Sequence, residues 1–192
     1  MILVRSGNMK MHQKILAAAM VTAAMIGPVS GAQAATRAST GTPPGLGDEK
    51  LSATTIALCN AGFGDVSVQS WDVTAGHLDM FCGDKDDDDT WVSGYNHIRD
   101  RHQGDWQAIV DSAGGGGNWD DLMMFMTDQS IRADDPEPEG DSKLCYSTSI
   151  EIHDEDGALL SVYNPTVIVS ANTRKVITSY PTIVPDCAGV RD

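Results

Sequence analysis

The sequence predicts an α+β domain, with N-terminal helices packed on a C-terminal antiparallel β-meander of about four strands. Two observations lead to this prediction. Apolar residues at helical spacing and helix-capping residues dominate up to about residue 131, whereas from residue 146 apolar residues recur at every second position between short turns. Strands joined by such short connections pair antiparallel. A run of helices followed by a run of strands is typical of the α+β class.

The N-terminus has the three parts of a secretory signal peptide, which we expect to cover residues 1–34. Arg5, Lys10 and Lys14 form a positive region, an apolar run of twelve residues follows at 15–26, and small residues at 32–34 suit cleavage. A retained membrane anchor is the alternative, but a membrane-spanning helix needs roughly 20 apolar residues. We therefore expect a secreted, extracellular protein with no membrane contact once the signal is cleaved.

Beyond the signal, residues 35–48 are small, polar and rich in proline and glycine, which predicts a flexible leader. Residues 49–192 have the length of a single domain, which we expect to be a monomer. All 27 acidic residues lie after residue 34, together with 10 of the 13 basic residues, so the formal charge of this part is 10 minus 27, or −17. Such a charge favours solubility and opposes a nucleic-acid binder of the ordinary basic kind.

Four cysteines remain after the signal, namely Cys59, Cys82, Cys145 and Cys187. An even number of cysteines in an exported protein indicates two disulfides. Of the three possible connectivities, we favour Cys59–Cys82 with Cys145–Cys187, because each pair then lies within one half of the chain. Their spacing fits no zinc motif, so no metal site is expected from the cysteines.

The helical half is predicted in five pieces. Ser52 or Thr54 can cap a first helix that ends at Cys59, and Asn118 or Asp120 can cap a last helix that ends near Ile131. Between them, the pattern predicts a strand over residues 66–73, a helix over 94–111 and a glycine linker over 113–117.

The strand half begins after a charged loop with two prolines at residues 133–142. Alternating or apolar segments then predict four strands, separated by turns at 154–157 and 171–174, over residues 146–152, 159–163, 166–170 and 175–180.

An acidic run at residues 84–89 raises the possibility of a calcium site. The EF-hand pattern requires Gly at loop position 6 and Glu at position 12. Counted from Asp84, these positions hold Asp89 and Tyr95, so the pattern fails. A solvated acidic loop is the favoured interpretation, with an irregular calcium site as the alternative.

The candidate catalytic residues cluster at His97, Arg101 and His102. On a helix, His97 and Arg101 share a face, whereas His102 is offset from His97 by roughly 140°, so the two imidazoles need not meet. Two imidazoles and a guanidinium suit cleavage of a phosphodiester, because histidine exchanges protons near neutral pH and arginine binds phosphate. The alternative is a polar surface helix in which His97 has a structural role.

The segment G-Y-N-H-I-R-D-R-H around these residues resembles the H-I-x-x-R-H signature of bacterial toxin ribonucleases of the barnase/EndoU/colicin/RelE-like group. The segment K-V-I-T-S-Y-P at residues 175–181 resembles the V-I-T-x-Y-P strand that ends those domains. Both motifs occur in the expected order, and the resemblance covers roughly residues 90–182.

The resemblance implies metal-independent RNA cleavage through a 2′,3′-cyclic phosphate, with His97 and His102 as acid and base in an order left open. It implies that Arg101 clamps the phosphate and that Thr178 and Tyr180, on one face of the last strand opposite Ile177 and Ser179, position it. A core-facing Tyr180 is the alternative. Three basic residues in or beside the motifs are candidates for substrate binding, although Arg99 occupies a variable position: Arg99, Arg174 and Lys175.

The sequence therefore predicts a secreted ribonuclease that acts on RNA without a cofactor, and a cognate inhibitor protein is a conceivable partner. The alternative is a non-catalytic secreted binding module on a nuclease-like scaffold, which the acidic charge favours.

Overall fold

The computed structural model describes residues 3–6, 51–133, 135–140, 142–154, 157–188 and 190. The predicted signal peptide, apart from Leu3–Ser6, and the predicted leader lie outside the described residues. Within these residues, the helices are too short or too polar for any of them to cross a membrane.

Three helices form at the predicted places: α1 (Ala53–Asn60), α2 (Gly94–Ser112) and α3 (Trp119–Arg132). Ser52 caps α1, because its side chain accepts a hydrogen bond from the backbone N–H of Thr55 at 3.2 Å. Helix α3 follows Asn118 and carries acidic residues in its first turn and Arg132 in its last, which suits the helix dipole. A side-chain cap bond is therefore found at α1, whereas the N-cap residues of α2 and α3, Ser93 and Asn118, make no such bond.

An antiparallel hairpin, β2 (Ser67–Val73) with β3 (Gly76–Phe81), connects α1 to α2. Strand β2 was predicted, and β3 was not. The buried residues of β3 are Leu78 and Met80, whereas His77 before them is exposed and Asp79 between the two is half-buried. The sequence of β3 therefore does alternate between buried apolar and more exposed polar residues, but the pattern is short because it contains only two buried apolar side chains.

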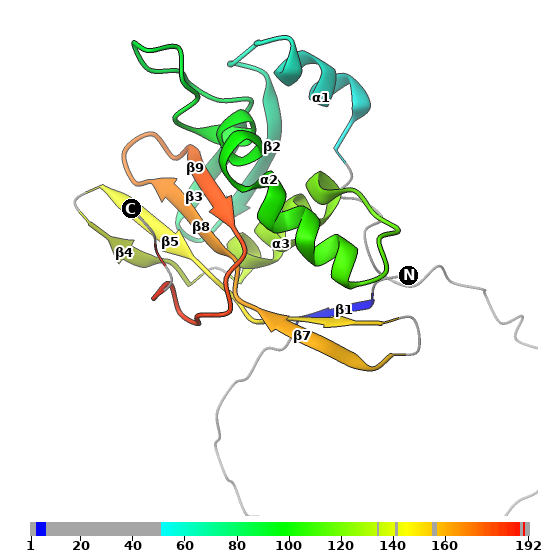
Figure 1. Cartoon of the computed structure of the whole chain (residues 1–192). Helices are drawn as coiled ribbons and strands as arrows, with labels where there is room; N and C mark the ends of the chain where they lie inside the picture. The colour runs from blue at the N-terminus through cyan, green and yellow to red at the C-terminus, as the bar shows by residue number, and fades with distance from the viewer. Residues whose placement is uncertain are drawn as a thin grey trace, which may run out of the picture. The chain divides into compact units, whose positions relative to one another are not determined.

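The α+β class and the order of helices before strands are confirmed, and the C-terminal strands divide between two antiparallel sheets (Figure 1). One sheet has the order β4-β5-β8-β9, and the other has the order β1-β6-β7. The bounds of their members are β1 (Leu3–Ser6), β4 (Glu137–Glu139), β5 (Lys143–Tyr146), β6 (Ile150–His153), β7 (Leu159–Tyr163), β8 (Thr166–Ser170) and β9 (Val176–Tyr180).

Two sequence predictions are corrected here. Residues 146–152 do not form one strand: Tyr146 ends β5 and Ile150 begins β6, in different sheets. The predicted loop at residues 133–142 contains the short strand β4, which extends the larger sheet at its edge. Strand β1 pairs with β6 from within the predicted signal peptide, so cleavage at residue 34 would remove it.

One hydrophobic core joins the helices, the hairpin and both sheets. Its largest fully buried side chains include Trp106 of α2, Tyr95 of α2 and Tyr146 of β5. Most of α3 is buried in this core, including Met123 and Met124. A smaller cluster of Cys145, Ile168 and Cys187, with Ile177 packed against it, lies apart from this core.

The favoured disulfide pairing is confirmed, since Cys59 bonds to Cys82 and Cys145 to Cys187. The first disulfide connects α1 to the residue that follows β3. The second connects β5 to the segment after β9. Both disulfides are buried, which fits a protein of an oxidising compartment.

Three glycines allow the chain to pass closely where the hairpin meets α2. A Cβ atom on Gly94 would lie 2.5 Å from the carbonyl oxygen of Phe81, and Gly94 also has a φ of +74°. A Cβ atom on Gly83 would overlap the carbonyl oxygen of Ser93, and one on Gly64 would overlap that of Gly83. Only glycine fits at these backbone contacts.

Replacing Gly94 with alanine is therefore expected to destabilise the protein by more than about 1 kcal/mol, because steric overlap adds to the left-handed backbone strain. Gly104 provides a matched control on the same helix, since a Cβ atom there would have no neighbouring atom within 4 Å among the described residues. Gly104→Ala should stabilise the protein by up to about 1 kcal/mol through helix propensity. Urea unfolding of both variants measures the difference, and equal midpoints would contradict this account.

Candidate active site

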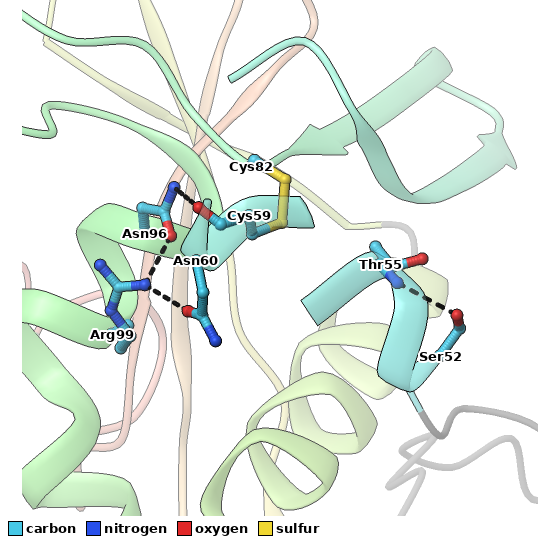
Figure 2. Close-up of a disulfide and its surroundings, with 7 residues drawn as sticks. All are labelled: Ser52, Thr55, Cys59, Asn60, Cys82, Asn96 and Arg99. Atoms are coloured by element: carbon cyan, nitrogen blue, oxygen red, sulfur yellow. Dashed lines mark hydrogen bonds between the residues drawn. A yellow bond between two sulfur atoms is a disulfide. The ribbon is translucent and has the colours of Figure 1, made fainter. Parts of the chain in front are cut away.

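The start of α2 is fixed by the first disulfide. The backbone N–H of Asn96 donates to the carbonyl oxygen of Cys82 at 2.8 Å, and its side-chain Nδ2 donates to that of Cys59 at 3.1 Å. Figure 2 shows both cysteines beside Asn96, with Arg99 reaching from α2 to Asn60 of α1. Asn96 is fully buried. The first turn of α2, which carries His97, is therefore held at a defined position.

His97 is half-buried and its ring orientation is fixed by the backbone. Its Nδ1 lies 3.0 Å from the carbonyl oxygen of Trp91. A carbonyl oxygen only accepts, so Nδ1 carries a hydrogen and donates it. The other ring nitrogen, Nε2, takes no part in this hydrogen bond.

His102 lies close to His97 despite the helical offset. The two ring centroids are 6.1 Å apart, with the rings edge to face. The ring of His102 also lies 5.0 Å from that of Tyr180, which belongs to β9. The two imidazoles therefore do lie close together, although the helical offset did not require it. With Tyr180 they form a cluster between α2 and β9.

The environment of His102 favours its neutral form. Burial lowers the pKa of its imidazole below the usual 6.5, and the neighbouring His97 lowers it further. Asp105 acts in the opposite direction, because its carboxylate lies 3.6 Å from Nδ1 of His102. Arg101 also lowers this pKa. His102 is therefore suited to accept a proton near neutral pH.

Strand β9 is attached to α2 and α3 along its buried face. Trp106 donates its indole N–H to the carbonyl oxygen of Ser179 at 3.3 Å, and the hydroxyls of Ser179 and Thr127 lie 2.8 Å apart. Figure 1 shows α2 running beside β9. Because Trp106 lies one turn beyond His102, the same contact also sets the separation of His102 from Tyr180.

Thr178 shares a face of β9 with Tyr180, since their partners Ile168 and Thr166 on β8 are two residues apart. Ser179 lies on the opposite face, as predicted. Ile177 does not lie there with it, because a register shift interrupts the alternation and Ile177 packs beside Ile168. The Oγ1 of Thr178 is buried and has no hydrogen-bond partner among the described residues.

The arginines of α2 differ in their surroundings. Arg101 is exposed and precedes His102. Arg99 is occupied by the protein itself: its Nη1 donates to Asn60 at 2.6 Å and to Asn96 at 2.9 Å, and it pairs with Asp100. The structure therefore gives Arg99 a role in joining α1 to α2.

The two basic residues before β9 lie toward the hairpin. Lys175 pairs with Asp84 at 3.4 Å and lies over the ring of Phe81 at 5.0 Å. The Nη1 of Arg174 is buried and has no hydrogen-bond partner within the described residues. Arg174 also has a φ of +60°, and its carbonyl oxygen accepts from the backbone N–H of Asp79.

Apart from Asp84, which pairs with Lys175, the acidic run at residues 84–89 is bonded locally. The carboxylate of Asp86 accepts from the backbone N–H groups of Asp88 and Thr90, and Lys85 pairs with Asp89 at 2.6 Å. Among the described residues, no three His, Cys, Asp or Glu side chains come together as a metal site would require.

Comparison of the chain with protein-family models, curated proteins and solved structures found no match. The site must therefore be interpreted from its own chemistry. Sequence reasoning missed two of its parts, namely the Trp91 carbonyl that orients His97 and the Asp105 carboxylate beside His102. Of these two, only Asp105 could have been found from the sequence, because an acidic residue three positions after His102 on a helix can reach its imidazole.

Proposed function

We propose that the protein is a secreted ribonuclease that cleaves RNA phosphodiesters by histidine acid–base catalysis, through a 2′,3′-cyclic phosphate. The observation that supports this proposal best is the His97–His102 pair at 6.1 Å, placed against Tyr180 where α2 meets β9. Two titratable groups in different surroundings are what a reaction with one proton acceptor and one proton donor requires.

The surroundings of the two rings favour one order of proton transfers. His102, with its lowered pKa, accepts the proton of the ribose 2′-hydroxyl. The 2′-oxygen then attacks phosphorus, and the bond from phosphorus to the 5′-oxygen breaks. His97 delivers a proton from Nε2 to that leaving oxygen, while its Nδ1 stays bonded to Trp91. The products are a 2′,3′-cyclic phosphate and a free 5′-hydroxyl.

Two residues are considered for binding the negatively charged phosphate. Arg101, exposed beside His102, is placed to pair with the phosphate oxygens. Thr178 lies on the Tyr180 face of β9, and its hydroxyl is buried without a partner among the described residues, so a local rearrangement would have to expose this hydroxyl before it could donate to the phosphate. Because the chain is acidic as a whole, binding should be modest and should weaken with salt.

The test is incubation of the purified, oxidised protein with end-labelled RNA in EDTA, at low salt and across pH 4 to 8. We expect fragments that end in 2′,3′-cyclic phosphate. No cleavage at any pH by the folded protein would refute the proposal and would favour the non-catalytic binding module.

The pH profile should report on His102. Its lowered pKa keeps the base deprotonated in weak acid, so kcat/KM should fall only at a pH below 6.5. Asp105→Asn removes a group that raises this pKa, and should therefore move the acidic limb to still lower pH. Asp100→Asn is the matched control on α2, since Asp100 pairs with Arg99 instead. A limb that moves to higher pH in Asp105→Asn would contradict the assignment of His102 as the base.

A further inference from the structure

A groove of about 240 Å³ is lined in part by Asp105, whose carboxylate lies 3.6 Å from Nδ1 of His102 in the proposed catalytic cluster. The two chain segments that build the cluster continue into it: Asp105 follows His102 on α2, and Pro181 follows Tyr180 after β9. The groove is lined by Asp105, Ala108, Ile109, Ser112, Tyr163 and Pro181. A ligand bound in it would therefore contact residues that adjoin His102 and Tyr180.

The far wall of the groove is held in place by hydrogen bonds. Tyr163 ends β7, and the backbone N–H of the next residue, Asn164, donates to the carbonyl oxygen of Thr182 at 2.6 Å. The side chain of Asn164 also donates to the carbonyl oxygen of Ile183 at 3.3 Å. These bonds join the segment after Tyr163 to the segment after Pro181, so the two sides of the groove are formed before any ligand binds.

The lining fits an uncharged planar group better than a phosphate. Asp105 is the single charged residue among the six, and it is negative, so a phosphate would be repelled. Tyr163, half-buried against the core, is the one aromatic residue of the lining, while the Asp105 carboxylate and the Ser112 hydroxyl can bond to polar edges. The groove is smaller than the roughly 300–1,000 Å³ of pockets for drug-sized ligands, which suits one base.

We propose that this groove is a nucleobase subsite, in which Tyr163 stacks on the base of one nucleotide that flanks the scissile phosphate. The inference rests on the proposed ribonuclease function and adds to it the part of the substrate that is bound. Asp105 then contacts both His102 and the base, so that base binding and the orientation of the catalytic imidazole are connected.

The experiment uses short oligonucleotides with a single 2′-hydroxyl, which permits cleavage at one bond only. One oligonucleotide is intact, a second lacks the base on the 5′ side of that bond, and a third lacks the base on the 3′ side. With the wild-type protein, one of the two abasic substrates should show kcat/KM lower by about 10-fold or more, as expected for loss of one stacked base.

Tyr163→Ala should lower kcat/KM for the intact substrate by a similar factor and should have little further effect on that same abasic substrate. Tyr163→Phe, which keeps the ring, should retain activity. Phe63→Ala is the control for loss of an exposed aromatic residue elsewhere, since Phe63 is 58 % exposed after α1 and lines no part of the groove. If Tyr163→Ala affects all three substrates equally, or none of them, the subsite inference is overturned while the ribonuclease function stands.

A binding measurement separates the two proposals if no cleavage occurs. Calorimetric titration with a nucleoside 3′-monophosphate and with ribose 3-phosphate should show tighter binding of the nucleotide, and Tyr163→Ala should remove the difference. Base-dependent binding without cleavage would overturn the proposed catalysis and keep the subsite. Equal binding of the two ligands would overturn the subsite.

Discussion

Replacing His102 with alanine should lower kcat/KM for RNA by about 10²- to 10⁴-fold, which is the range that general acid–base catalysis supplies. The reason is that His102 is the proposed proton acceptor and contacts both His97 and Tyr180. The fold should survive, because the ion-pair partner of His102, Asp105, lies on the same helix. Cleavage of a labelled RNA, followed at the pH optimum, measures the effect.

The variant His97→Ala should show a loss of similar size, and the double variant should be little worse than either single one, because the two imidazoles act as a unit. His153→Ala is the control, since His153 lies on β6 and bonds to Glu151 and Gly157 instead. Melting temperatures close to that of the wild type would show that the fold is intact. Full activity in a folded His102→Ala variant would remove this residue from the mechanism.

Removing the Cys59–Cys82 disulfide should destabilise the protein by about 2–5 kcal/mol, as is typical of native disulfides in small domains. The paired change Cys59→Ala with Cys82→Ala avoids a free thiol. This disulfide also positions Asn96 through the carbonyl oxygens of both cysteines, one residue before His97. We therefore expect a loss of kcat in addition to the loss of stability, measured under conditions in which the variant is still folded.

Cys145→Ala with Cys187→Ala is the matched comparison. That disulfide closes a longer loop, with a sequence separation of 42 against 23, so its loss should cost at least as much stability. It lies in the small cluster with Ile168, away from the start of α2. Activity in the folded state should then be nearly unchanged. Equal losses of kcat in the two paired variants would contradict the role given to the first disulfide.

Much of the fold could be predicted because local signals agree with it. Ser52 and Asn118 mark helix starts, and the alternating apolar residues of the second half mark strands. The division of residues 146–152 between two sheets could not be predicted, since the alternation continues through Ser147–Ser149 and carries no information about which partner strand lies alongside. The shift at Ile177 is of the same kind, because it depends on pairing with β8.

The site was predictable in its residue types but not in its geometry. Spacing alone placed His102 well away from His97 around the helix, and their approach depends on how the side chains lie against β9 and Tyr180. For Arg99, a contact with a distant part of the chain could not be foreseen. Its position in the motif suggested substrate binding, yet Asn60, which is distant in sequence, occupies its guanidinium. Tyr163 had no local signal, since its importance depends on the segments that pack beside it.

Because β9 is attached to α2, the candidate site can form only after β9 has been synthesised. The contact of Trp106 with Ser179 joins residues 73 positions apart. Ribosomes add about 5–20 residues per second, so roughly 4–15 seconds separate the synthesis of the two partners. During that interval both histidines are present, but Tyr180 is not. A nascent or truncated chain that lacks β9 therefore carries the proposed catalytic histidines without the arrangement that would make them act together.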